Sequence, residues 1–389
     1  MALRAIVLLA VQWRMPCSGN VLVEITRQRW LGTDRSARIG PIVLKLAGAM
    51  AVLASVVPYG AISARATGAD MCSGSFDPYS VSPIVLNACG VALFPLQESS
   101  TLADGSTEFD YLVEGAKMTY VVPPQGLDFS SASAAELAEY GIPPAPSDPS
   151  ALSDWQDMIA HLHLVTPPPS LAATSITNVT NPSNVWSGYE AYSSSSTAYN
   201  LVEGQYNEPQ ALSTPCAGNA ATTWAGLGGD GSQDLAQDGT AINAPGLGQH
   251  QAWSEVLPDQ PYSIAQPLSG HPGWRFYAEV NHISGGFHMY LYDSESGDGT
   301  AFTVHSNNYS GKTADFIVER PIVNHAPVPL TNYAYINYIQ TYVNNISSSS
   351  GVGAYPHSPI TMEVSDTLAT VTGLSNSGQT FTDDYKNCS

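Results

Sequence analysis

Two carboxylates in the string Glu108-Phe-Asp-Tyr-Leu-Val-Glu114 are the first residues whose types suggest chemistry. A pair of carboxylates on a sheet is how β-sandwich glycosidases arrange an acid and a nucleophile. On one extended strand Glu108 and Glu114 would lie about 20 Å apart at ~3.3 Å per residue, whereas a retaining pair needs about 5–5.5 Å. A solvated strand face is therefore the better interpretation.

Several familiar hydrolase signatures are absent from the sequence. Without Gly-x-Ser-x-Gly a serine hydrolase loses its main support, and without His-Glu-x-x-His so does a zinc protease. Neither Asp-Thr-Gly nor Asp-Ser-Gly occurs, as two-aspartate proteases would require. CxxC and CxxH spacings are also missing, so we expect no metal and no cofactor. The nine histidines are scattered, and His161 and His163, expected on one helix, would point to different faces, so we interpret them as solvated.

Five short motifs follow one another in the second half of the chain. They are Val185-Trp-Ser-Gly-Tyr189, Thr223-Trp-Ala-Gly-Leu-Gly-Gly229, Leu235-Ala-Gln-Asp-Gly-Thr240, Gln251-Ala-Trp-Ser-Glu255 and Ala314-Asp-Phe-Ile-Val-Glu-Arg-Pro321. In this order and spacing they resemble the glutamic peptidases, or eqolisins, which are secreted acid endopeptidases of fungi and some bacteria. Each motif is weak alone, but the ordered set, over roughly residues 175–340, is a strong signal.

The resemblance implies a fold and a catalytic pair. The family fold is a concanavalin A-like, or lectin-like, β-sandwich of two antiparallel sheets, and the pair is one glutamine and one glutamate. Carried onto this sequence, the catalytic residues are Gln237 and Glu319. Trp224 corresponds to the tryptophan of the substrate cleft. Trp253 and Glu255 correspond to a Trp-x-Glu pair that supports substrate binding, in which Glu255 is expected to position its neighbours.

The sequence departs from the family pattern at three positions. Gly228 stands where some members carry Asp, Asp315 replaces the usual Glu, and Trp274 stands where Asp is common. These differences concern the binding subsites rather than the catalytic pair.

Strand alternation supports a functional position for Glu319 independently. In Phe316-Ile-Val-Glu319, Phe316 and Val318 fall on one face of a strand, and Asp315, Ile317 and Glu319 fall on the other. Peptide hydrolysis by water needs a base, a donor to the oxyanion and an acid for the leaving amine. Glu319 can serve as base and then as acid, and the side-chain amide of Gln237 can serve as the donor.

Plainer interpretations of the same residues stay open. Glu319 could be a solvated strand glutamate, and Trp224 and Trp253 could be buried packing residues. A lectin-like sandwich that binds carbohydrate without catalysis, or a β-sandwich glycosidase, would use the same fold.

The elements that would position these residues change character along the chain. From Val185 onward, short runs rich in β-branched and aromatic residues alternate with turn clusters, which indicates an antiparallel sandwich or barrel. Before it, a capping box at Ser133–Glu136 opens a short helix ending near Gly141, and Asp148-Pro149 opens a second helix through His163. Residues 67–122 are predicted to form short strands. After the two helices, a proline-rich joint is predicted at residues 166–176.

Three segments follow from these signals: an upstream extension with a secretory signal (residues 1–66), a small mixed α/β pro-region or accessory domain (67–174), and the β-sandwich (175–389). The signal is inferred from Arg35, Arg38 and Lys45 before the apolar run 46–57 and the small-x-small site 64–66. Twelve apolar residues are too few for a membrane span, which needs ~20. We therefore expect a secreted, extracellular protein whose pro-region keeps it folded or silent as a zymogen.

The charge of the chain narrows the classes of partner that it could bind. Residues 66–389 hold 5 basic and 31 acidic residues, a net charge of −26, which would repel nucleic acid and anionic membranes. We expect protein or peptide substrates and a monomer.

Four cysteines remain after signal removal in an oxidising compartment, which allows three pairings. We favour Cys72–Cys89 and Cys216–Cys388, because each pair then lies within one predicted domain.

Overall fold

A computed structural model of the 389-residue chain describes residues 12–14, 22–24, 78–80, 86, 89–174, 184–347 and 349–389. The chain divides into two compact units, Met1–Ser63 and Ala64–Ser389. In the first unit, strand β1 (Gln12–Arg14) pairs antiparallel with β2 (Leu22–Glu24). The predicted secretory signal at residues 35–66 lies outside the described residues. All that follows concerns the second unit.

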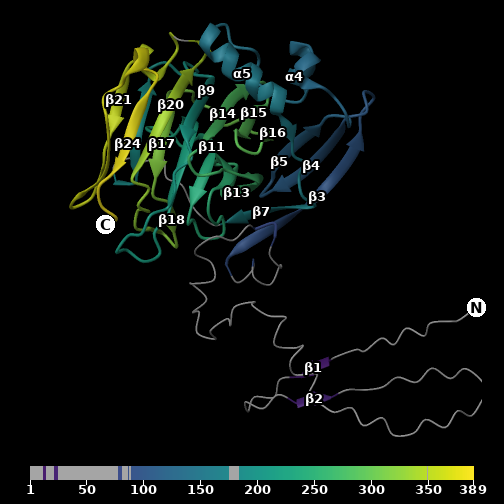
Figure 1. Cartoon of the computed structure of the whole chain (residues 1–389), viewed down its shortest axis with the longest axis horizontal. Coiled ribbons are helices and arrows are strands. Elements are labelled where there is room, and N and C mark those ends of the chain that lie inside the picture. Colours follow the sequence, from purple (N-terminus) through teal and green to yellow (C-terminus); the bar gives the residue numbers. More distant parts are fainter. Residues whose placement is uncertain are drawn as a thin grey trace, which may run out of the picture. The chain divides into compact units, whose positions relative to one another are not determined.

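One antiparallel sheet, called sheet 1 here, carries every strand that contains a predicted motif; two of these strands, β11 and β17, are labelled in Figure 1. Its strands in spatial order are β21 (His357–Ile360), β8 (Trp186–Tyr192), β17 (Thr313–Glu319), β10 (Ala221–Gly228), β11 (Leu235–Ile242), β12 (Gln251–Leu257), β13 (Gln260–Ser269), β7 (Ser170–Thr174) and the first half of β3 (Val91–Thr101).

The second layer, called sheet 2, is also antiparallel apart from one short parallel pairing. Its strands in order are β22 (Met362–Glu363), β23 (Thr367–Val371), β24 (Phe381–Tyr385), β20 (Tyr335–Val343), β9 (Leu201–Asn207), β14 (Arg275–Ile283), β15 (Gly286–Asp293), β16 (Asp298–His305), β5 (Ala116–Val122), β4 (Thr107–Val113) and the second half of β3. The short β6 (His163–Leu164) pairs parallel with β16, and β18 (Ile322–Val323) pairs with β19 (Ala326–Pro327) in a separate hairpin.

The main hydrophobic core lies between the two sheets, because alternate residues of their strands point inward. Phe316 and Val318 of β17 belong to this core with Phe276, Ala278 and Val280 of β14. Ile317, on the opposite face of β17, belongs to a second cluster with Trp186, Trp224 and Trp253. The predicted two-sheet sandwich and the predicted alternation in β17 are both confirmed.

Two helices before the sandwich cover the outer face of sheet 2, beside β9, β14 and β15 (Figure 1). Helix α4 (Ala134–Glu139) has the predicted capping box, with Ser133 and Glu136 bonding each other's backbone N–H groups, and it follows the short 3₁₀ turn η2 (Phe129–Ser131). Helix α5 begins at Pro149, where the Asp148 carboxylate accepts from the Ala151 N–H.

The predicted end of α5 is wrong. The helix stops at His161, and His163 lies in β6, where its backbone pairs with β16. The remaining short turns are η4 (Val352–Ala354) and η5 (Asn376–Gly378). Among the described residues, no helix is both long and apolar enough to cross a bilayer.

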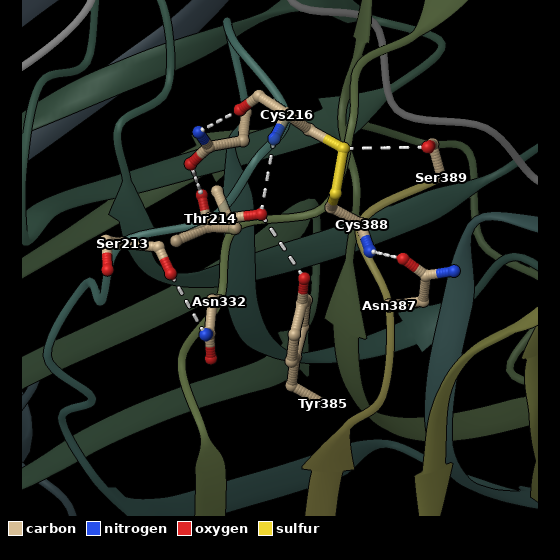
Figure 2. Close-up of a disulfide and its surroundings, with 10 residues drawn as sticks. Ser213, Thr214, Cys216, Asn332, Tyr385, Asn387, Cys388 and Ser389 are labelled. Carbon is tan, nitrogen blue, oxygen red and sulfur yellow. Dashed lines mark hydrogen bonds between the residues drawn. A yellow bond between two sulfur atoms is a disulfide. The ribbon is translucent and has the colours of Figure 1, made fainter.

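The predicted Cys216–Cys388 disulfide is confirmed and ties the end of the chain to the sandwich (Figure 2). The two Cα atoms lie 6.1 Å apart. The Cys388 carbonyl also accepts a hydrogen bond from the backbone N–H of Leu330. Cys89 is disulfide-bonded too, but Cys72, its predicted partner, lies outside the described residues.

Strands β3 to β7, which precede the predicted sandwich boundary, extend both sheets. β7 pairs with β13 at one edge of sheet 1, and β5 pairs with β16 in sheet 2. β3 joins the layers, since Val91–Pro95 pairs with β7 and Leu96–Thr101 pairs with β4. This part of the chain is therefore continuous with the sandwich rather than appended to it.

Candidate functional site

The register of sheet 1 places Gln237 and Glu319 on the same face. Gln237 of β11 lies opposite Gly226 of β10, and Glu319 of β17 lies opposite Thr222 of β10. Gly226 and Thr222 are four residues apart on one strand, so these two positions and the residues paired with them lie on the same face of the sheet. This face, turned away from sheet 2, is called the site face here.

Gln237 is held by a hydrogen bond across the sheet. It lies directly opposite Glu255 of β12, and its Nε2 donates to Glu255 Oε2 at 2.9 Å. Both side chains are buried. The bond orients the glutamine amide and leaves its second N–H for another acceptor, because an amide nitrogen has two donors.

Glu319 is held in a similar way by Trp224. The indole Nε1 of Trp224 donates to Glu319 Oε2 at 3.0 Å, and both side chains are fully buried. Trp186 packs edge-on against Trp224, with ring centroids 5.1 Å apart at 79°. Gly226 and Thr222, the β10 partners of the glutamine and the glutamate, are four residues apart, and Trp224 lies midway between them on the same face of β10.

Gly226 allows the Trp224 ring and Gln237 to lie close together. A Cβ at Gly226 would sit 3.0 Å from Cζ3 of Trp224 and 3.1 Å from Cβ of Gln237. These distances are tighter than normal carbon contacts, so a larger residue would push the two side chains apart. This gives a physical reason for the glycine in the Trp-Ala-Gly motif.

Trp253 and Glu255 both lie on the site face, as the resemblance implies. Trp253 is opposite Gly239 and belongs to the same hydrophobic cluster as Trp186, Trp224 and Ile317. The structure thus brings five predicted site residues together on one face of the neighbouring strands β17, β10, β11 and β12: Trp224, Gln237, Trp253, Glu255 and Glu319. Each of the five is buried.

The site face is covered in this structure by chain that precedes the sandwich. Leu86, Val91 and Ala172 belong to the cluster that contains Trp186, Trp224 and Trp253. The Tyr79 hydroxyl donates to the carbonyl of Ala265 on β13 and accepts from the Ala172 N–H. Tyr79 and Leu86 therefore pack on the same side of sheet 1 as the candidate site.

A second pair of carboxyl groups lies level with Gln237 across sheet 1. Asp315 lies opposite Gly226, and Glu190 of β8 lies opposite Asp315. Burial raises the pKa of Glu190 to about 7, assisted by the charge of Asp230. Burial also raises the pKa of Asp315 well above its usual range, and the charge of Glu190 adds to this.

Glu190 was not predicted from the sequence as a site residue. Strand alternation contains the signal, because Glu190 follows Trp186 by four residues and so shares its face. Thr222, the cross-strand neighbour of Glu319, was missed as well, since it lies one residue before the motif that begins at Thr223.

The carboxylates that suggested a glycosidase are not brought together. Glu108 lies near the start of β4, and Glu114 lies beyond its end, in the turn to β5. Glu108 is opposite Val121 of β5, and both glutamates are at least partly accessible to solvent.

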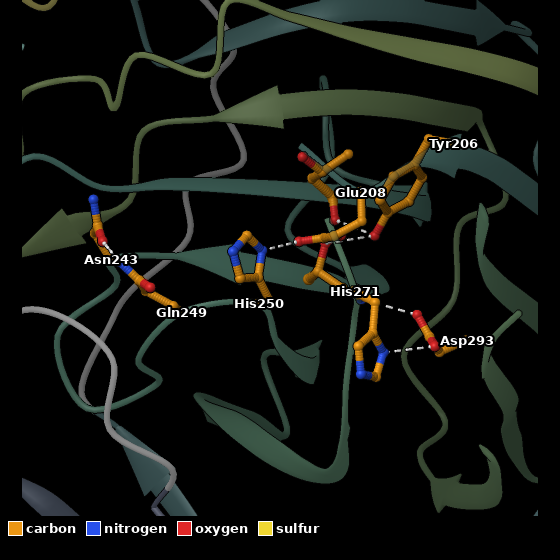
Figure 3. A network of polar contacts seen from close by, with 9 residues as sticks. Tyr206, Glu208, Asn243, Gln249, His250, His271 and Asp293 are labelled. Atoms are coloured by element: carbon orange, nitrogen blue, oxygen red, sulfur yellow. Dashed lines mark hydrogen bonds and ion pairs between the residues drawn. The ribbon is translucent and has the colours of Figure 1, made fainter. Parts of the chain in front are cut away.

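The prediction of solvated histidines is wrong for His250 (Figure 3). Its Nδ1 lies 2.7 Å from Oε1 of Glu208, whose side chain is fully buried, and Thr240 Oγ1 donates to the other Glu208 oxygen at 2.6 Å. His271 makes a similar 2.8 Å contact with buried Asp293, although about half of the His271 side chain stays exposed. In the part of the chain that the structure describes, no group of three or more His, Cys, Asp or Glu could hold a metal ion.

Comparison with known proteins agrees with the motif pattern. The sequence model of the peptidase A4 family matches residues 184–384. None of the curated proteins matches the chain. Two crystal structures of scytalido-glutamic peptidase, one with a peptide-based transition state analog and one with a transition state analog inhibitor, are similar at 18% and 17% identity, with TM-scores of 0.43 and 0.44. A structure of SCP-B, a member of the eqolisin family, in a complex with the tripeptide Ala-Ile-His is similar at 16% identity and a TM-score of 0.42. Each covers 52% of this chain and 98% of its own.

Proposed function

Because the chain belongs to the peptidase A4 family and is a glutamic-type peptidase, we propose that it is a secreted endopeptidase that cleaves peptide bonds at acidic pH through Glu319 and Gln237. The observation that supports this assignment most directly is the placement of both side chains on one sheet face, each fixed by a hydrogen bond: Trp224 to Glu319 and Gln237 to Glu255.

Glu319 acts first as the base. Its carboxylate, oriented by the Trp224 indole, takes a proton from a water molecule, whose oxygen then attacks the carbonyl carbon of the substrate. The carbonyl becomes a tetrahedral oxyanion. Preorganisation matters at this step, since a carboxylate already fixed in position needs no rearrangement as charge develops.

Gln237 stabilises that oxyanion. One of its amide N–H groups is engaged by Glu255, and the second donates to the developing charge. Its Oε1 has no hydrogen-bond partner among the described residues and can accept from the attacking water. Glu319, now protonated, gives the proton to the amine nitrogen, the C–N bond breaks, and a carboxylic acid and an amine leave.

The covered site face fits a zymogen. Gln237 and Glu319 are fully buried, and Leu86, Val91 and Ala172 belong to the cluster on that face. A peptide substrate could reach the pair only after this preceding chain moves or is cut away. Incubation at pH 4 followed by N-terminal sequencing would test this. Full activity from a chain that still begins before Tyr79 would contradict it.

The proposals of secretion and of an acidic pH optimum are supported by the distribution of charge along the chain and by the disulfide. The basic-apolar-small order of residues 35–66 is typical of an export signal, and the Cys216–Cys388 disulfide fits an oxidising compartment. A chain with a net charge of −26 after residue 65 carries few cations to repel one another in acid. Recovery of the protein only from the cytoplasm of its own cells would argue against export.

Digestion of haemoglobin or casein at pH 3–4 tests the proposal directly. A glycan-binding screen with the same preparation tests the lectin-like alternative. Hydrolysis at pH 3–4 with no glycan retained supports the peptidase. Glycan binding without hydrolysis, after the preceding chain has been removed, would instead favour the lectin.

A further inference from the structure

An open cleft lies between helix α5 and the outer face of sheet 2, and it is called the α5 cleft here. Its volume is about 500 Å³, within the range of about 300–1,000 Å³ that is typical of small-molecule sites. The helix contributes side chains spaced three or four residues apart, which therefore lie on one side of it: Asp154, Asp157, Met158 and His161. The proposed catalytic pair lies on the other sheet, so peptide hydrolysis does not use this cleft.

The floor of the α5 cleft is formed by strands of sheet 2. Arg275 and Tyr277 of β14 project from one face of that strand, and Asn207 of β9 lies directly opposite Arg275. Tyr277 also lies opposite Tyr292 of β15, and both rings belong to one hydrophobic cluster with Met158 of α5. The floor therefore combines a guanidinium group with aromatic and apolar side chains.

Trp274 lines the same cleft and is 51% exposed. It lies in the turn before β14, where its backbone N–H donates to the carbonyl of His271 at 3.0 Å. Trp274 is also one of the three positions at which the sequence departs from the family pattern. An exposed indole beside a cleft offers a large apolar face to a ligand.

Arg275 has hydrogen-bond donors that the protein leaves unused. Its Nη1 donates to Asp154 at 2.7 Å and to the Tyr277 hydroxyl at 3.2 Å. The hydrogen bonds found among the described residues engage neither its Nε nor its Nη2, and a third of the side chain is accessible to solvent. These two nitrogens form one edge of the planar guanidinium, and such an edge matches the two oxygens of a carboxylate.

Asp157 offers a charged acceptor one helical turn from that ion pair. The residue is exposed, and its carboxylate has no hydrogen-bond partner among the described residues. Residues three apart on a helix have Cβ atoms about 5–6 Å apart, and Asp154 already contacts Arg275. Asp157 and the unused edge of Arg275 therefore border the α5 cleft at a separation that a small molecule with two opposite charges can bridge.

We propose that the α5 cleft binds a free amino acid with an apolar side chain. The ligand's carboxylate pairs with the unused edge of Arg275, and its ammonium group donates to Asp157. Its side chain packs against Trp274 and the apolar floor.

The charge of the protein favours such a zwitterion over a simple anion. Asp154 lies beside Arg275, and the chain after residue 65 has a net charge of −26, so a lone carboxylate would be repelled. An amino acid brings its own positive charge and is neutral as a whole. Free amino acids are also end products of protein digestion, so this ligand is one that a peptidase encounters.

Calorimetric titration of the full chain with L-phenylalanine at pH 7 tests the site. We expect one saturable site per chain. N-acetyl-L-phenylalanine lacks the positive charge and L-phenylalaninamide lacks the carboxylate, so each should bind at least about tenfold more weakly. Absence of saturation with L-phenylalanine, or equal binding of either analogue, refutes the proposal.

Three variants locate the ligand in the α5 cleft. Asp157→Asn removes the partner of the ammonium group, and Arg275→Lys keeps the charge but loses the planar edge, so each should weaken binding about tenfold or more. Trp274→Ala should weaken the binding of L-phenylalanine more than that of glycine, which has no side chain to pack.

Two controls separate this site from other effects. Glu98→Gln, exposed on β3, removes the same charge as Asp157→Asn and should bind L-phenylalanine like the wild type. Glu319→Gln, on the other sheet, should do so too, whether or not the peptidase mechanism holds. Unchanged binding in Asp157→Asn, with circular dichroism confirming that the variant is folded, would overturn the proposal. So would an equal loss of binding in Glu98→Gln.

Discussion

Trp224 and Glu319 lie on neighbouring strands of sheet 1, and the indole N–H of the first donates to the carboxylate of the second at 3.0 Å. The two residues come from motifs separated by more than 90 positions in the sequence. Their contact joins the proposed base to one of the tryptophans of the site face, and it helps to orient the Glu319 carboxylate.

Trp224→Phe should therefore impair catalysis while preserving the fold. Phenylalanine fills much of the same space but cannot donate to Glu319. We expect kcat/KM to fall about 10–100-fold, the equivalent of one hydrogen bond to a charged group. Tyr335→Phe is the control, since Tyr335 is 57% exposed on β20 of sheet 2 and should retain normal kinetics. Equal losses in both variants would indicate a general packing effect.

Glu319→Gln should reduce proteolysis to background, because water loses both its base and the later acid. Gln237→Ala should cost about 10²–10³-fold, as expected for removal of one oxyanion donor. Since both groups act on one water and one carbonyl, the double variant should be little worse than the worse single variant. Kinetics on a fluorogenic peptide at acidic pH, beside thermal unfolding, would measure all three.

Asp315→Asn is the control for those variants. Asp315 lies on the site face but is not one of the proposed catalytic groups, and its raised pKa means that the carboxyl is already uncharged in acid. The amide has the same size, so activity should stay near normal. Near-normal digestion by Glu319→Gln would refute the mechanism.

Stability should be greatest in acid and should fall as the pH rises from about 4 to 7. Burial raises the pKa of Glu190, Glu203 and Asp383 to about 7 from ordinary values of 4.5, 4.5 and 3.8. The folded protein therefore binds more protons than the unfolded chain across this window, and deprotonation favours unfolding. Each fully shifted carboxyl contributes at most about 3–4 kcal/mol.

Urea unfolding at half-unit steps between pH 4 and pH 8 would measure this effect. Glu203→Gln removes one shifted group and should flatten the curve. A free energy of unfolding that rises toward neutral pH would contradict the expectation.

Reduction of the Cys216–Cys388 disulfide should destabilise the sandwich. The bond closes a loop with a sequence separation of 172 residues. The entropy model assigns about 4–5 kcal/mol to a loop of more than 100 residues, often less in practice. Urea midpoints of Cys388→Ser and the wild type would give the difference. Because the bond lies outside the site face, the folded variant should keep its kcat.

The sequence was most informative where regular local patterns decide the structure. The capping box at Ser133 and the alternation in Phe316–Glu319 depend only on neighbouring residues, and both are confirmed. The ordered motifs led to the sandwich and the family. The end of α5 at His161 was not predicted, because the backbone of His163 pairs with β16, more than 130 residues away.

The pairings of buried acids could not be predicted for a similar reason. Glu203 and Glu279 are ordinary strand glutamates until the register places them opposite each other. His250 likewise gives no local sign that it contacts buried Glu208. Each of these contacts depends on which strands become neighbours, and a single sequence does not specify that order.

Strand β3 has a consequence for any maturation by cleavage. Its first half pairs with β7 and its second half with β4, and β7 and β5 in turn occupy the edges of β13 and β16. Loss of the chain up to Thr174 would remove β7 from β13 and β5 from β16. The backbone N–H and C=O groups along those edges of β13 and β16 would then have no strand to pair with. Exposed strand edges recruit other strands, so the matured peptidase would gain two places for self-association or for extended peptides to add on.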